Sequence, residues 1–337
     1  MYRLLSLILA LGLLVSPSLQ ALSLNPLDWF EGAEVTSIDG SDQSNEIAES
    51  LLETAKAKYA AGKLRAAKRT LKKIIKEHSA APAAGEALTI RARIYMSKSL
   101  WIKGFDDLQK VVTKHANYEK FDRVIADQFD CATALMEGAR GRILWIFPGF
   151  KQYGTSAKQF EQIVRNAPYS DYAPLALMNI ALVSEQINEP EEAIDALDRL
   201  INYYPQSMLA PDAYYNLAQT YSDLVQGYEY DQGSTRRAIS YYEDFLILFP
   251  SSHLTGEVEA NLRNMENLLA SSRLNLGDFY YYFRNNNTAA LVFYNEAITI
   301  EPDSEAAAEA RLRIADIESG VRPTNKASIL RKLLRAE

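Results

Sequence analysis

Apolar and small residues recur at fixed offsets along most of the chain, most clearly between Ala210 and Pro302. The first copy of the pattern there consists of Leu217, Ala218, Tyr221, Ala238, Tyr242 and Pro250. The second copy consists of Leu276, Gly277, Tyr280, Ala290, Tyr294 and Pro302. Apolar residues spaced three and four apart predict amphipathic helices, and a proline after each second helix marks its end. The pattern predicts antiparallel helix pairs, packed so closely that only Gly or Ala fits where the two backbones approach.

These positions resemble the tetratricopeptide signature, Leu-Gly-x-x-Tyr followed by Ala-x-x-x-aromatic and Pro, which has a period of about 34 residues. One helix pair cannot bury its apolar face alone, so neighbouring pairs must stack. We therefore expect an all-α fold, a tetratricopeptide-repeat superhelix (α-solenoid) of about five to six helical hairpins over residues 46–320. Such an array leaves an open groove, which suits the binding of other polypeptides.

Three interruptions of the repeat are expected. Several glycines and Pro148 predict an inserted loop at about 137–154. The distance between Tyr221 and Ala238 is too long for the repeat and predicts an insert at about 225–234. An unbroken apolar stripe predicts one long helix at about 255–284.

The N-terminus has the features of an export signal. Arg3 precedes an apolar run from Leu4 to Val15, and small residues follow it up to Ala21. The run is shorter than the roughly 20 apolar residues of a membrane span, so residues 1–21 are predicted to be a signal peptide cleaved after Ala21, with an uncleaved anchor as the alternative. Residues 22–45 are expected to form a linker and 321–337 a basic tail. This predicts an exported protein.

Composition narrows the choice of partners. The chain is 48% hydrophobic and 23% charged, with a formal net charge of -7. Clustered Lys and Arg are expected only in the C-terminal tail, so no nucleic-acid partner is predicted. Cys131 is the only cysteine and is expected to be buried on a helix. No cysteine directly follows the apolar run, so no lipobox cysteine is expected.

No arrangement of residues typical of catalysis is found. His78, His115 and His253 lie far apart and lack neighbours at metal-ligand spacing. The sequence contains no Gly-rich phosphate loop, nucleophile elbow or HExxH motif. We therefore expect no catalytic residues, no metal, no cofactor and no enzymatic activity.

Two candidate binding surfaces follow from the pattern. A second stripe on each first helix, spaced three and four apart, should face the concave side and bind an extended or helical peptide. Its candidates are Tyr59, Tyr215, Gln219, Ser222, Asp278 and Tyr281. The inserted loop is unusually apolar and is a candidate for contact with a partner or for peripheral membrane association, unless it folds back to seal a gap between hairpins. Its residues are Ile143, Leu144, Trp145, Ile146 and Phe147.

Residues 155–319 resemble the BamD family of outer-membrane assembly proteins. The resemblance is carried by Asp231-Gln232, Thr235-Arg236 and Ala238, by the Phe279–Phe283 stretch, and by the ending Ile300-Glu-Pro302-Asp-Ser304. It implies a periplasmic scaffold, associated with the outer membrane, that binds the barrel-inserting subunit and unfolded outer-membrane proteins. Family members normally carry a lipidated cysteine and have a shorter N-terminal array. A general cell-envelope adaptor, tied to peptidoglycan or secretion machinery, is the alternative.

Overall fold

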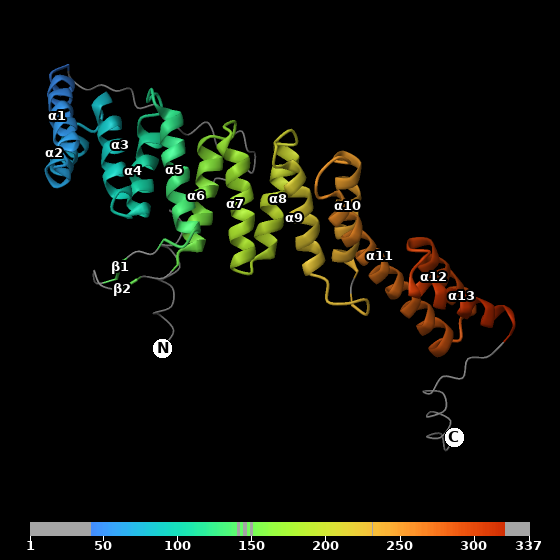
Figure 1. Cartoon of the computed structure of the whole chain (residues 1–337). Coiled ribbons are helices and arrows are strands. Elements are labelled where there is room, and N and C mark those ends of the chain that lie inside the picture. Colours follow the sequence, from blue (N-terminus) through green and yellow to red (C-terminus); the bar gives the residue numbers. More distant parts are fainter. Residues whose placement is uncertain (1–41, 140–141, 144–146, 149–150, 231, 321–337) are drawn as a thin grey trace, which may run out of the picture.

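The computed structural model describes residues 42–139, 142–143, 147–148, 151–230 and 232–320. Within these ranges the chain is an all-helical tetratricopeptide-repeat superhelix, as the sequence pattern predicted. Figure 1 shows its hairpins standing side by side in a row, from α1 and α2 at one end to α12 and α13 at the other. The predicted signal peptide, most of the predicted linker and the basic tail lie outside the described residues.

Six helix pairs and a last single helix make up the row. The pairs are α1 (Asp42–Ala60) with α2 (Leu64–Glu77), α3 (Pro82–Met96) with α4 (Trp101–Lys114), α5 (Phe121–Met136) with α6 (Tyr153–Asn166), α7 (Tyr172–Gln186) with α8 (Pro190–Tyr203), α9 (Ala210–Asp223) with α10 (Gly233–Leu248), and α11 (Thr255–Asp278) with α12 (Asn287–Ile300). Helix α13 (Glu305–Glu318) closes the array by packing on α11 and α12.

Local sequence sets where the helices begin and turn. Proline is the first residue of α3 and α8, where its missing N–H has no partner to lose. The side chain of Asn286 accepts a hydrogen bond from the Ala289 amide and caps α12, and Ser304 caps α13 in the same way. The chain leaves α1 through Gly62 at φ 71°, a left-handed conformation that glycine adopts without strain.

The observed boundaries differ from the expected ones at several points. Helix α1 begins at Asp42, so residues 42–45 belong to the first hairpin and not to the linker; the Asp42 carboxylate suits the positive end of that helix. Residues 137–152 connect α5 to α6, and 224–232 connect α9 to α10. The long helix runs as α11 to Asp278 and continues as a π-helical turn, η2 (Phe279–Phe283).

The connection between α5 and α6 contains the two described strands. β1 (Arg142–Ile143) pairs antiparallel with β2 (Phe147–Pro148), and Ile143 lies opposite Phe147. Leu144, Trp145 and Ile146 lie outside the described residues. The described strands therefore form a short antiparallel pair within this connection.

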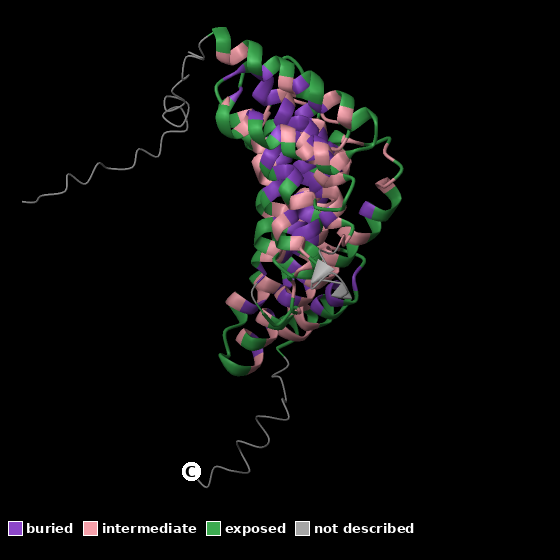
Figure 2. Cartoon of the chain, turned by 90° about the vertical axis from the view of Figure 1, so that its left-hand side faces the viewer, coloured by how far each residue is buried: buried purple, intermediate pink, exposed green. Residues whose placement is uncertain are grey.

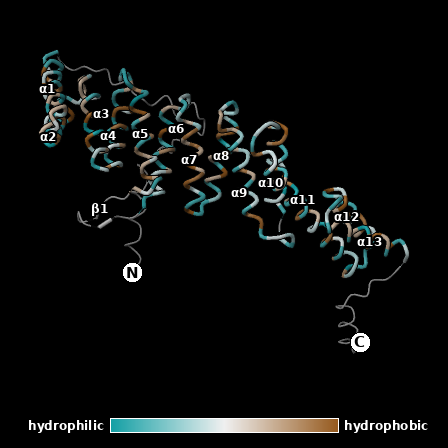
Figure 3. Tube along the Cα trace, in the orientation of Figure 1, coloured by the Kyte–Doolittle hydropathy of each residue, from teal (hydrophilic) through white to brown (hydrophobic). Residues whose placement is uncertain are grey.

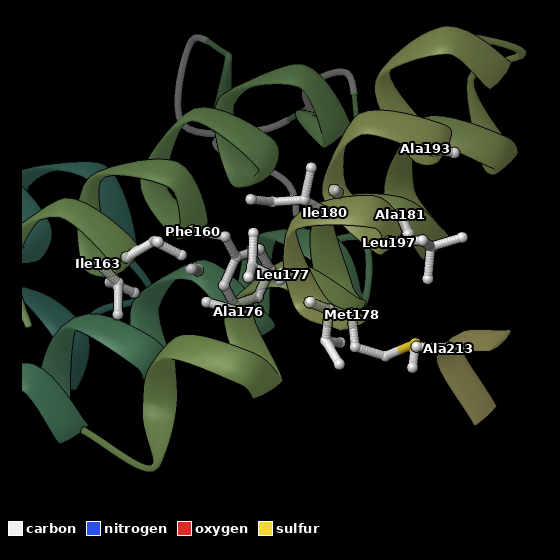
Figure 4. Close-up of a cluster of buried hydrophobic side chains, with 14 of the residues drawn as sticks. Phe160, Ile163, Ala176, Leu177, Met178, Ile180, Ala181, Ala193, Leu197 and Ala213 are labelled. Atoms are coloured by element: carbon white, nitrogen blue, oxygen red, sulfur yellow. The ribbon is translucent and has the colours of Figure 1, made fainter. Parts of the chain in front are cut away.

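The core runs through the middle of the row. Figure 2 shows buried residues along the centre and exposed residues on the outside, and Figure 3 shows hydrophobic and hydrophilic positions alternating along each helix. In the close-up of Figure 4, Ala181 on α7 lies beside Leu197 on α8, which also carries Ala193, while Phe160 and Leu177 lie together where α6 meets α7. All five are nearly or fully buried, as close helix packing requires.

The core is divided into three clusters. One belongs to the first hairpin and α3, the largest extends from α3 to the first half of α11, and the third surrounds the second half of α11 with α12 and α13. Helix α11 contributes Val258 to the largest cluster and Ala270 to the last one. It is long because it links two separately packed cores.

Candidate protein-binding surface

The first helices of successive hairpins form one continuous face. Helix α1 contacts α3, α3 contacts α5 and α5 contacts α7, while side-chain hydrogen bonds join α9 to α7 and to α11. We call the surface formed by α1, α3, α5, α7, α9 and α11 the inner face. The predicted binding stripe lies on these helices.

On α9 the predicted residues mainly hold neighbouring helices together. The Tyr215 hydroxyl donates a 2.7 Å hydrogen bond to Oε1 of Glu257 on α11, and the Ser222 hydroxyl lies 3.4 Å from the sulfur of Met265 on the same helix. Burial, together with the bond to Glu257, raises the pKa of Tyr215 to about 12, so the phenol stays protonated and keeps donating. Both side chains are half-buried at this joint.

Gln219 hydrogen-bonds to α10 and to a neighbouring residue on the same surface. Its Oε1 accepts a 3.2 Å hydrogen bond from the hydroxyl of Tyr242, a fully buried residue of α10. Its Nε2 donates a 2.9 Å bond to Oδ1 of Asp223. Gln219 therefore satisfies a buried phenol, and only part of its polar surface faces outward.

The two predicted residues of the last hairpin make contacts within it. Asp278 is half-buried, accepts one hydrogen bond from Tyr294 and lies 3.4 Å from Arg313 of α13. Tyr281 is only 3% exposed and packs edge-on against the Tyr294 ring, so its prediction as a surface residue is wrong. The π-helical turn is the reason: Arg284 bonds back five residues to the carbonyl of Phe279, and the wider turn directs Tyr281 into the core.

The remaining predictions fall at the other end of the row and on the loop. Tyr59 on α1 is 38% exposed, so a partner can reach its ring. Ile143 and Phe147 are paired in β1 and β2. The other three loop candidates, Leu144, Trp145 and Ile146, lie outside the described residues. The structure therefore brings the predicted stripe residues together only on α9.

The inner face also exposes two leucines that the sequence interpretation missed. Leu175 and Leu182 on α7 are 38% and 44% exposed. Relative to Ala181 they occupy the positions that Asp212 and Gln219 occupy relative to Ala218 on α9. Applying the same offsets to α7 would therefore have found them.

A second apolar surface lies at the turns that join hairpins. Tyr169, Met208 and Tyr203 are 100%, 94% and 73% exposed; Tyr169 and Met208 belong to the α6–α7 and α8–α9 connections, and Tyr203 is the last residue of α8. Together with Leu175 they line one cleft between these two turns. We call Tyr169, Leu175, Tyr203 and Met208 the apolar edge. Apolar side chains clustered at the surface in this way are typical of partner-binding sites.

Ion pairs and hydrogen bonds fix the helices beneath these surfaces. Arg91 on α3 makes two hydrogen bonds, of 2.6 and 2.8 Å, to the buried carboxylate of Asp107 on α4. Arg199 on α8 holds Glu161 on α6 at 2.9 Å, and these contacts lower the pKa of Glu161 against the effect of its burial. These contacts hold together the helices that form the inner face, so its shape is set before a partner binds.

The described residues offer no group of three His, Cys, Asp or Glu side chains placed to hold a metal ion. Across the same residues, no helix combines the length and apolar character that crossing a membrane requires. Cys131 is fully buried on α5, and burial raises the pKa of its thiol to about 12, which leaves it unreactive at neutral pH.

One charged surface contradicts the expectation that basic residues cluster only in the C-terminal tail. Helix α2 carries six Lys and Arg residues and a single Glu. The net charge of the whole chain conceals this local concentration, because acidic residues elsewhere outnumber it.

Two family models match different parts of the chain. A family model described as YfiO, outer membrane lipoprotein, matches residues 148–326, which is more than half of the chain. A tetratricopeptide-repeat model matches residues 52–101, within the first two hairpins. The YfiO match thus covers all helices from α6 onward, together with the inner-face leucines and the apolar edge.

Two curated relatives are outer membrane protein assembly factors BamD. The protein of Rickettsia prowazekii is 27% identical over 130 residues, which cover 39% of this chain and 52% of the relative. The protein of Caulobacter vibrioides is 24% identical over 121 residues, which cover 36% of this chain and 40% of the relative. The matched segments thus span about half of these relatives or less.

Solved structures with a similar helical arrangement are more distant in sequence. PilF of Pseudomonas aeruginosa is 14% identical, with a TM-score of 0.30 over 81% of this chain and 100% of that one. A tetratricopeptide-repeat protein of Parabacteroides merdae is 13% identical, with a TM-score of 0.32 over 80% of this chain and 97% of that one.

Proposed function

The chain belongs to the YfiO family of outer membrane lipoproteins, and from this premise we propose that it is a periplasmic scaffold, associated with the outer membrane, that binds other proteins during the assembly of β-barrel proteins. The partners we propose are the barrel-inserting subunit and unfolded outer-membrane proteins. Families of this kind are non-catalytic interaction modules, and this chain is not an enzyme.

The observation that carries the proposal is the position of the exposed apolar residues. Leu182 and the apolar edge lie on α7, at the end of α8 and in the α6–α7 and α8–α9 connections, all inside the segment that matches the family. An unfolded outer-membrane protein presents alternating apolar and polar side chains. The exposed leucines and tyrosines offer contacts to the apolar ones.

Polar groups next to these residues suit an extended peptide. Asp212 and Gln219 follow on α9, and Glu185 on α7 accepts a 3.0 Å hydrogen bond from the Thr220 hydroxyl of α9. An extended backbone needs such donors and acceptors because it has no internal hydrogen bonds. Preorganised helices reduce the entropy lost on binding.

Capture from a solubilised envelope fraction tests the proposal. The tagged chain should retain a barrel-inserting protein and outer-membrane clients, and replacing Leu182 and Met208 with Ser should reduce both. Ile247→Ser is a suitable control because Ile247 is 75% exposed on α10, outside the apolar edge. Recovery of only cell-wall or secretion components would contradict the proposal.

A general cell-envelope adaptor is the second candidate, and the first two hairpins favour it. Residues 52–101 match a general tetratricopeptide model, and the YfiO match begins only after them. Two arrays joined in one chain can bind two partners. Capture of peptidoglycan-associated or secretion proteins through Tyr59 on α1 would support this candidate.

A further inference from the structure

Helix α2 presents a row of cations on one side. Arg65, Arg69, Lys72, Lys73 and Lys76 are all exposed, and at 3.6 residues per turn they fall within an arc of about 100°. The row is about 17 Å long at 1.5 Å per residue. We call these five residues the basic face.

Acidic side chains of the protein neutralise almost none of the charge of the basic face. Its single ion pair among the described residues joins Lys73 to Glu77 at 3.9 Å, and both side chains are about half exposed. Such a contact contributes little. Lys68, just outside the face, lies over the Tyr95 ring on α3 instead. The charges are therefore available to an external anion.

The shape of the surface distinguishes between kinds of partner. The apolar side of α2, with Ala67, Leu71 and Ile74, is fully buried against α1 and α3. No large apolar or aromatic side chain interrupts the row of cations, whereas protein interfaces are anchored by such residues in a desolvated centre. A straight row of long, flexible cations fits a flat anionic surface better than a protein pocket.

The position of α2 in the fold also favours a flat anionic surface as the partner. The first hairpin ends the row of described hairpins, and none of the other described hairpins lies beyond it (Figure 1). The corresponding second helix of the fourth hairpin, α8, has the opposite character, with Glu191, Glu192, Asp195 and Asp198 against one arginine. Helix α2 thus concentrates positive charge at the N-terminal end of the described row of hairpins, in a chain whose net charge is -7.

We propose that the basic face of α2 binds the anionic headgroups of a phospholipid surface, and that it orients the solenoid with its first hairpin against the membrane. Four to eight Lys and Arg residues on one amphipathic helix are typical of such sites. The binding is electrostatic, because the apolar side of α2 is occupied within the fold. The proposal concerns a hairpin outside the YfiO match and does not depend on the proposed partners.

Vesicle binding of the full chain tests this proposal. The basic-face variant combines Arg69→Gln, Lys72→Gln, Lys73→Gln and Lys76→Gln. The control variant combines Lys98→Gln, Lys103→Gln, Lys114→Gln and Lys158→Gln, which removes the same charge from exposed positions outside α2. Both variants keep the N-terminal apolar run, so any insertion of that run affects both equally. Circular dichroism melting checks that both remain folded.

Partitioning is measured onto phosphatidylcholine vesicles with and without phosphatidylglycerol. We expect the basic-face variant to lose more than about tenfold in partitioning onto the anionic vesicles, the control to lose less than about threefold, and added salt to remove the difference. Equal losses in the two variants, or equal binding to neutral vesicles, would overturn the proposal. It would also be overturned if the basic face bound duplex DNA or a second copy of the chain more tightly than anionic vesicles.

Discussion

The hydroxyl of Tyr294 donates a 2.7 Å hydrogen bond to Oδ1 of Asp278, and the Tyr294 ring lies directly against Gly277. Tyr294 is fully buried on α12, whereas Gly277 and Asp278 end α11. Burial and the bond to Asp278 raise the pKa of Tyr294, so the phenol remains a donor at neutral pH. This contact holds the last hairpin closed.

Tyr294→Phe is expected to destabilise the last hairpin by about 1–2 kcal/mol. A hydrogen bond to a charged acceptor contributes this much or more, and Asp278 keeps its contact with Arg313. The midpoint of urea unfolding, followed by circular dichroism, measures the effect. Tyr169→Phe is the control, since Tyr169 is fully exposed and the change should stay within about 0.5 kcal/mol. Equal shifts in the two variants would disprove the role of the hydrogen bond.

Gly277→Ala should destabilise the chain although alanine favours helix. A methyl group at Gly277 would overlap the Tyr294 ring, and forcing the two helices apart costs about 1–3 kcal/mol. Gly256→Ala on the same helix is the matched comparison, because a methyl group there meets nothing. It should be neutral or stabilise by up to about 1 kcal/mol. Thermal melting that moves in the same direction for both variants would refute the close approach.

Arg91→Leu should cost about 3 kcal/mol of stability. Arg91 is 13% exposed and binds an Asp107 carboxylate that is 4% exposed. Its removal leaves Asp107 buried with only Lys110 nearby, at 3.0 Å. Lys103→Gln on the same helix as Asp107 is the control, because Lys103 is exposed. Chemical denaturation of both variants tests whether the ion pair supports the joint between α3 and α4.

Glu266→Gln should stabilise the chain at neutral pH. Burial raises the pKa of Glu266, and the carboxylates of Glu301 and Glu243 raise it further. The folded state therefore holds the proton more tightly than the unfolded state, and stability falls as pH rises from the ordinary value of 4.5 through the raised pKa.

The test compares the melting temperatures of Glu266→Gln and of the unchanged chain at pH 7 and at pH 4. The variant should melt higher at pH 7, and the difference should shrink at pH 4, where the wild-type carboxyl is protonated. Glu259→Gln, on the exposed side of the same helix, serves as the control. A variant that is less stable at pH 7 would contradict the repulsion between the three carboxylates.

The repeat pattern predicted the fold because its residues are constrained by contact. Ala218 and Ala238 are fully buried where α9 meets α10, and Tyr242 fills the space beside them. Any larger residue at the two alanines would separate the helices, so the physical requirement is visible in the sequence. Gly277 is constrained in the same way, because a larger residue there would overlap the Tyr294 ring.

The binding surface was predicted less well because it depends on helix register. Tyr281 was assigned by a regular helical spacing, and the π-helical turn changes that spacing at the residue itself. Leu182 occupies on α7 the stripe position that Gln219 occupies on α9, but its apolar side chain resembles a core residue, and only its offset from Ala181 distinguishes the two. The basic face of α2 was missed because the net charge averages over the whole chain.

Photocrosslinking from position 182 in intact cells tests the central claim most directly. A crosslinking amino acid at Leu182 lies on the inner face, whereas the same group at Glu192 lies on the exposed side of α8. The account predicts adducts with a barrel-inserting protein and with outer-membrane clients from position 182, and few or none from position 192. Adducts from position 182 that lack both classes of protein would contradict it.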